Sequence, residues 1–125
     1  MDRSRQIACT AIASLEDHKG QDLRIIDIHD VTVIADYFII AGGSNINQVK
    51  ALADHDEEAL GRKGFTTSRI EGYNSASWIL MDYGDVVIHI FSKESRQFYD
   101  LERIWRDGKN MDPQTFMQEE AQEEV

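Results

Sequence analysis

The stretch WILMDYGDVVIHIF, residues 78–91, decides the fold of this chain. It predicts two β-strands, 77–82 and 85–91, because runs rich in Val and Ile around an Asp-x-Gly-Asp segment are typical of a tight hairpin. We expect the two strands to be joined by the two-residue turn Tyr83-Gly84. The rest of the chain has to cover or extend this hairpin.

Side chains alternate across a strand, so parity assigns each hairpin residue to one of two faces. The first strand carries Trp78, Leu80 and Asp82 on one face and Ile79, Met81 and Tyr83 on the other. Both faces are largely apolar. Either helices cover both of them, or one face stays open for a partner. Trp78 accordingly has two interpretations, as a core residue or as an exposed interface anchor.

The elements around the hairpin follow from apolar periodicity and from cap and turn residues. Helices are predicted at 3–18, 45–64 and 92–108, and further strands at 23–28, 36–41 and 65–70. The first two strands are close in sequence and are expected to pair antiparallel. The order of elements predicts an α/β (α+β) fold, with a mixed sheet of about five strands and helices packed on it.

The length of 125 residues allows one domain, which we place at residues 1–108. Residues 109–125 are expected to form an acidic tail that is disordered or weakly helical. No apolar run reaches the roughly 18 residues of a membrane span, and the first residues show neither a signal peptide nor a basic leader. The single cysteine, Cys9, fits a reducing cytosol, so a cytoplasmic location is expected.

The formal net charge is −10, from 13 Lys and Arg against 23 Asp and Glu. Nucleic-acid binding draws its affinity from clustered Lys and Arg, and this sequence has no such cluster. A basic protein is the partner that this charge favours, because opposite charges speed and orient encounter.

Catalytic patterns are weak. The loop residues Gly43 and Ser44 are similar to the Gly-Ser entry of nucleotidyltransferases, which then need carboxylates for Mg²⁺, and Asp82 and Asp85 are the nearby pair. A tight turn and a hairpin turn explain these four residues better. The histidines show no spacing for a zinc site, and His89 is expected to be a hydrogen-bonded core residue. We therefore expect no enzyme activity, no metal and no cofactor.

Several unusual stretches resemble a known family, in the right order and at the right distances. They are DYFIIAGGSNINQVKALAD at 36–54, Glu71-Gly72, the hairpin stretch, and the pattern Arg96-x-Phe98-Tyr99-x-Leu101-Glu102-x-x-Trp105. Over about residues 4 to 106 the chain is similar to the ribosomal silencing factors, also called Iojap-like proteins. Ala35 departs from the family, in which a Thr or Ser is common at this position.

The resemblance implies a fold related to the nucleotidyltransferases without their catalytic residues. It implies binding of the large ribosomal subunit through its protein number fourteen, with little direct RNA contact, and exclusion of the small subunit when nutrients are short. The matching positions expected to face the partner are Trp78, Asp82, Tyr83, Glu71 and Ser75. The protein is expected to be a monomer or weak homodimer.

Two alternatives remain open from the sequence. One is a minimal nucleotide-binding or nucleotidyltransferase-like domain that uses Gly43 and Ser44 with Asp82 or Asp85. The other is an oligomerising adaptor, in which an open sheet face pairs with a second copy.

Overall fold

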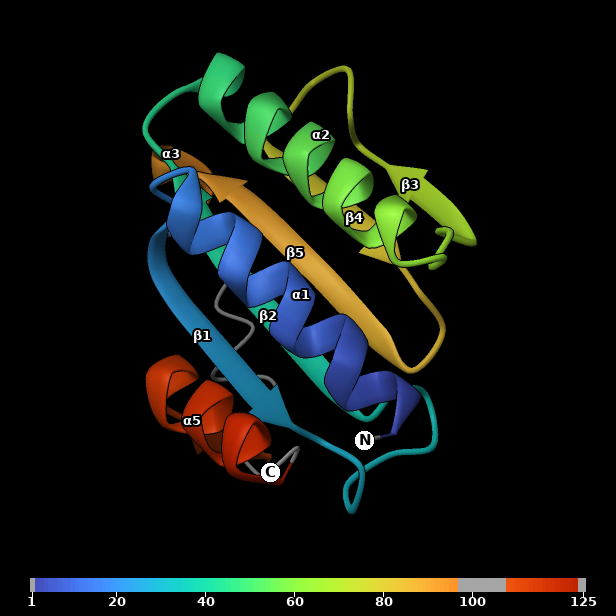
Figure 1. Ribbon diagram of the computed structural model, residues 1–125. Coiled ribbons are helices and arrows are strands. Elements are labelled where there is room, and N and C mark those ends of the chain that lie inside the picture. Colours follow the sequence, from blue (N-terminus) through green and yellow to red (C-terminus); the bar gives the residue numbers. More distant parts are fainter. Residues whose placement is uncertain (1, 97–107, 124–125) are drawn as a thin grey trace.

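A computed structural model describes residues 2–96 and 108–123, and Figure 1 shows helices α1 and α2 lying side by side across one face of a sheet. The elements are α1 (Arg3–Asp17), β1 (Gln21–Asp27), β2 (Tyr37–Gly43), α2 (Ile46–Arg62), β3 (Arg69–Glu71), β4 (Trp78–Asp82), β5 (Val86–Ser92), α3 (Lys93–Arg96), β6 (Lys109–Met111) and α5 (Pro113–Glu123). The mixed α+β fold expected from the sequence is confirmed. Of the expected helix at 92–108, residues 93–96 form α3, and 97–107 lie outside the described residues.

The sheet has six strands in the order β3-β4-β5-β2-β1-β6, one more than expected. The central pair, β2 and β5, is parallel, and the other neighbours are antiparallel. The antiparallel pairing of β1 with β2 agrees with the prediction. The strand expected at 65–70 lies further along the chain, where Arg69–Glu71 form the three-residue edge strand β3.

The hairpin of β4 and β5 is present, with Trp78 opposite Phe91 and Asp82 opposite Val87. Its turn differs from the prediction by one residue. The Tyr83 amide donates to the Val86 carbonyl at 3.0 Å, so Gly84 and Asp85 are the central turn residues. Gly84 has a φ of 85°, in the left-handed region that glycine adopts without a steric penalty.

The two faces of the sheet bury separate apolar clusters, as parity predicts. Ile79 and Met81 of β4 pack with the apolar stripes of α1 and α2 in the larger cluster. The smaller cluster lies on the other face and contains Ile26, Ile28, Ala35, Phe38, Ile40, Val87 and Phe91. These seven side chains are 0–7% exposed, so of the two alternatives that the sequence left open, a covered face holds for them. Solvent reaches this second face at Trp78 and Leu80, which are partly buried.

The tail was expected to be disordered or weakly helical, and residues 109–123 form a strand and a helix. Residues 109–111 pair with β1 as strand β6, and the helix that follows packs against α1 and β1. The Asp112 carboxylate accepts a hydrogen bond from the Thr115 amide at 3.1 Å, and Pro113 occupies the first helical position. Phe116 is 1% exposed and meets the Tyr37 ring edge-on at 5.4 Å. Burial of the Phe116 ring favours an ordered segment, although the acidic composition of the segment by itself favours disorder.

Candidate binding surface

An aromatic group occupies the second face of the sheet at β4 and β5. The Trp78 ring stacks on Phe91 with 5.2 Å between ring centroids and an interplanar angle of 27°. The Trp78 Nε1 donates a hydrogen bond to the Nδ1 atom of His89 at 3.1 Å. Trp78 is therefore a packed residue that stays partly exposed, and its role as an interface anchor remains a prediction.

His89 lies beneath this group and is 3% exposed. Burial lowers its pKa to about 4, so the ring is neutral at physiological pH. Because Nδ1 accepts the Trp78 hydrogen bond, the proton of the neutral ring sits on Nε2. His89 is thus the hydrogen-bonded core histidine that the sequence predicted, and it fixes the Trp78 indole in place.

Carboxylates border the aromatic group along the β3–β4 edge. Arg69 pairs with Asp82 and Glu71 with Leu80 in the strand register, so these four side chains share the face of Trp78. Arg69 lies 3.6 Å from an Asp82 oxygen and 3.5 Å from a Glu71 oxygen. Such exposed ion pairs contribute little to stability. The predicted residues Trp78, Asp82 and Glu71 therefore form one surface with Leu80 and Arg69, which we name the β3–β4 edge surface.

Tyr83 does not belong to this surface. Its side chain is 2% exposed and packs in the larger cluster, on the face that α1 and α2 cover. Burial, together with the nearby carboxylates of Asp56 and Glu57, raises the pKa of its hydroxyl. The prediction of Tyr83 as a partner-facing anchor is wrong for this structure, because parity places it with Ile79 and Met81.

Ser75 is exposed in the loop that leads into β4, at the opposite end of that strand from Asp82. Gly72 is required there, since a Cβ atom at this position would lie 2.1 Å from the Trp78 carbonyl oxygen. The loop places Ser75 beside the start of β4, and Ser77 accepts a backbone hydrogen bond from Ser92 at 3.1 Å. Ser75 therefore lies outside the acidic part of the β3–β4 edge surface.

The residues of the nucleotidyltransferase alternative are not brought together. Gly43 lies opposite Ser92 at one end of the parallel pair, whereas Asp82 is in register with Val87 near the other end. At about 3.3 Å per residue, these ends are on the order of 15 Å apart. Asp85 is at the distant end too, because its carbonyl oxygen accepts from the Asp36 amide at 2.7 Å. The described residues thus place no Asp82–Asp85 metal site beside the Gly-Ser loop.

The Gly43-Ser44 segment is a tight turn that caps α2. A Cβ atom at Gly43 would lie 2.8 Å from the Val49 side chain. Asn45 caps the Gln48 amide at 2.9 Å, and the Gln48 side chain accepts from the Ser44 amide at 2.5 Å. An open depression of about 620 Å³ lies beside this turn, with Ser77, Ser92, Lys93 and Glu94 among its lining residues.

Two further searches of residues 2–96 and 108–123 bear on function. No cluster of three or more His, Cys, Asp or Glu side chains has an arrangement able to hold a metal ion there. No helix within the described part of the chain combines the length and apolar composition that crossing a bilayer requires.

The fold and surface together define a small α+β domain with an aromatic and acidic sheet edge. The chain matches, over residues 1–125, the family model described as "Ribosomal silencing factor during starvation". It therefore belongs to the ribosomal silencing factor family, and the resemblance seen in the sequence is confirmed.

Individual relatives agree with this assignment. The chain is 35% identical over 104 residues to the "Ribosomal silencing factor RsfS" of Bacillus subtilis, covering 83% of this chain and 88% of that protein. A crystal structure of a Chromobacterium violaceum protein matches with a TM-score of 0.81 and 36% identity, covering 90% of this chain and 92% of that chain. A Bacillus halodurans structure matches with a TM-score of 0.74 and 31% identity, over 82% and 93% of the two chains.

Proposed function

We propose that this protein is a translation repressor that binds the large ribosomal subunit through its protein number fourteen. By occupying the joining face of that subunit, it blocks the small subunit and slows translation under nutrient limitation. The observation that carries this proposal is the family match over residues 1–125, together with relatives that are named ribosomal silencing factors.

The mechanism requires occupancy and no chemistry. A folded chain of 14.3 kDa bound at a joining face excludes its competitor by volume. The degree of repression is then set by the affinity and concentration of the protein relative to the small subunit. This agrees with the separation of the Gly-Ser loop from Asp82 and Asp85.

The β3–β4 edge surface is the part of the fold that we assign to this contact. It has an apolar centre, formed by Trp78 and Leu80, and at its border the exposed carboxylate of Glu71 and the partly buried one of Asp82. Interfaces of this composition place aromatic anchors in the middle and charges at the rim. A basic ribosomal protein complements both the local carboxylates and the net charge of −10.

Trp78 itself is a poor choice for a first mutational test. Truncation to Ala would remove the stack on Phe91 and leave His89 without its indole donor. A loss of binding in such a variant would mix lost packing with lost contact. Glu71 is exposed and forms a surface ion pair with Arg69, so its replacement removes little packing and separates the two effects.

We expect Glu71→Arg to weaken comigration with purified large subunits at least tenfold in a sedimentation assay. The matched control is Glu57→Arg, which makes the same charge change on the exposed face of α2. The free energy of unfolding of both variants should stay within about 1 kcal/mol of the wild-type value, as is usual for substitutions at exposed positions. Equal binding by the two variants would remove the β3–β4 edge surface from the contact. A wild-type protein that does not comigrate with large subunits at micromolar concentration and low salt would refute the proposed function.

A further inference from the structure

The loop between β1 and β2 exposes apolar side chains. Val33 is fully exposed, Ile34 is 65% exposed and Val31 is 42% exposed. At both ends of the loop the apolar residues turn inward, since Ile28 is 0% and Ala35 5% exposed. Adjacent exposed apolar side chains on a folded domain point to a binding surface.

Hydrogen bonds within the loop hold this apolar tip. The Ile28 amide donates to the Asp36 carbonyl at 2.8 Å and closes the loop. The Val31 and Thr32 amides both donate to the Ile28 carbonyl, at 2.9 and 3.0 Å. The Ile34 amide donates to the Thr32 hydroxyl at 3.2 Å. A loop held in this way loses less conformational entropy on binding than a free one.

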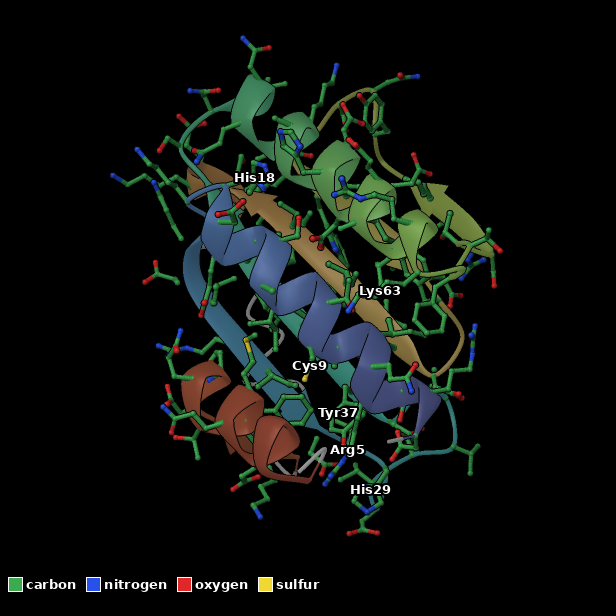
Figure 2. All side chains as sticks on the ribbon, in the orientation of Figure 1. Arg5, Cys9, His18, His29, Tyr37 and Lys63 are labelled. Carbon is green, nitrogen blue, oxygen red and sulfur yellow. The ribbon has the colours of Figure 1, made fainter. Side chains whose placement is uncertain are left out.

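The loop stands at an acidic end of the sheet. Asp36 is bonded to Asp85 through the backbone at 2.7 Å, and Asp82 lies in the same row of the sheet as Val87 and Phe38. On the other side of the loop, His29 lies between Asp27 and Asp30, with 3.2 Å from its Nε2 atom to Asp30. Figure 2 shows His29 at the same end of the molecule as Arg5 and Tyr37.

The cations at this end do not cancel its charge. Arg69 is shared by Asp82 and Glu71, and Arg5 lies 3.9 Å from Asp2. Lys109 is opposite Asp27 in the pairing of β6 with β1. Among the described residues, the carboxylates at this end of the sheet therefore outnumber the Lys and Arg side chains; they include Asp27, Asp30, Asp36, Asp82 and Asp85.

The negative charge at this end of the sheet limits which class of partner can bind the loop tip. A phosphate backbone or an anionic lipid would be repelled, because carboxylates outnumber Lys and Arg among the described residues at this end. A second copy would bring the same carboxylates against each other. A basic protein surface with an apolar depression satisfies both the tip and its border.

We propose that the loop at residues 28–36 is an anchor for the same basic protein of the large ribosomal subunit. Val33 and Ile34 insert into an apolar depression of that protein. At the rim of the depression, its Lys and Arg side chains pair with Asp36, Asp82 and Asp85. This inference rests on the proposed function. The contact is continuous with the β3–β4 edge surface, since Asp82 belongs to both and β4 lies two strands, about 10 Å, from β2. The docking surface then extends along the acidic end of the sheet.

The test is a double variant, Val33→Ser with Ile34→Ser, assayed by sedimentation with purified large subunits. Both side chains are exposed, so the melting temperature should stay close to the wild-type value, and binding should weaken at least tenfold. The matched control is Ile46→Ser, because Ile46 is 51% exposed but begins α2 at the other end of β2. It should bind as the wild type does.

The outcomes separate this inference from the proposed function. If the wild type and the double variant bind large subunits equally, the loop is not an anchor and the proposed function stands. If the double variant binds normally but loses self-association in light scattering, the tip contacts a second copy and the proposal is overturned. If the wild type does not bind large subunits, both claims fall.

Discussion

Asp56 lies in the middle of α2 with 0% of its surface exposed. Burial raises the pKa of its carboxyl group well above the usual value, and the nearby Ser14 hydroxyl opposes that shift. Among the described residues, neither carboxylate oxygen has a partner that meets hydrogen-bond geometry, and the same holds for the buried Tyr83 hydroxyl. A carboxyl group in such a place destabilises the fold most when it is ionised.

We expect Asp56→Asn to stabilise the protein by about 1–2 kcal/mol at pH 8, because the amide carries no charge to desolvate. The pKa of Asp56 is raised in the folded protein. Its effect on the free energy of unfolding is therefore most favourable below the unfolded-state pKa of about 3.9, where the group is neutral in both states. That stability is lost as pH rises through the folded-state pKa. The gain from Asn should therefore grow from pH 4 to pH 8. Urea unfolding across this range measures it, with the exposed Glu57→Gln as control. A gain that does not change with pH would contradict the assignment.

Asp56 also shows what the sequence contains at the residue scale. Val49, Leu52, Ala53 and Leu60 recur at helical spacing along α2, and all four are buried. Their period includes position 56, where an Asp interrupts it. The period therefore indicates a buried position 56, whereas a charged residue in a helix is usually exposed. Side-chain parity in β4 correctly grouped Tyr83 with Ile79 and Met81, but both faces are apolar, so parity alone did not show that helices cover this one.

At the scale of elements, β6 and α5 show where composition misleads. The acidic content of residues 109–125 predicts disorder. The local signals predict a helix, because Asp112 is an N-cap residue and Pro113 follows at the first helical position. The apolar residue Phe116 then anchors the helix to the core. The hairpin, by contrast, was predictable because its strands are adjacent in sequence and strongly apolar.

Phe116→Ala should destabilise the protein by about 3–5 kcal/mol, the usual cost of truncating a buried Phe. The control is Gln118→Ala, at an exposed residue two positions after Phe116. It should change the free energy of unfolding by no more than about 0.5 kcal/mol. Chemical denaturation of the two full-length variants gives the comparison. Equal stabilities would mean that α5 contributes nothing to the folded core.

At the scale of the whole molecule, the central parallel pair determines which residues meet. β2 and β5 are far apart in sequence, and their pairing has no local signal. It separates Gly43 and Ser44 from Asp82 and Asp85, and it brings the loop Ile28–Asp36 to the acidic end. The sequence could therefore suggest the candidate residues and the family, but only the sheet order decides which of them share a surface.

Subunit joining is the measurement that tests the proposed repression most directly. The protein would be titrated into equal amounts of separated small and large subunits, and joined ribosomes would be followed by gradient sedimentation. We expect the joined fraction to fall with a midpoint set by the affinity of the protein for the large subunit, and the protein to migrate with large subunits alone. Undiminished joining at saturating protein, or migration of the protein with joined ribosomes, would contradict repression by exclusion.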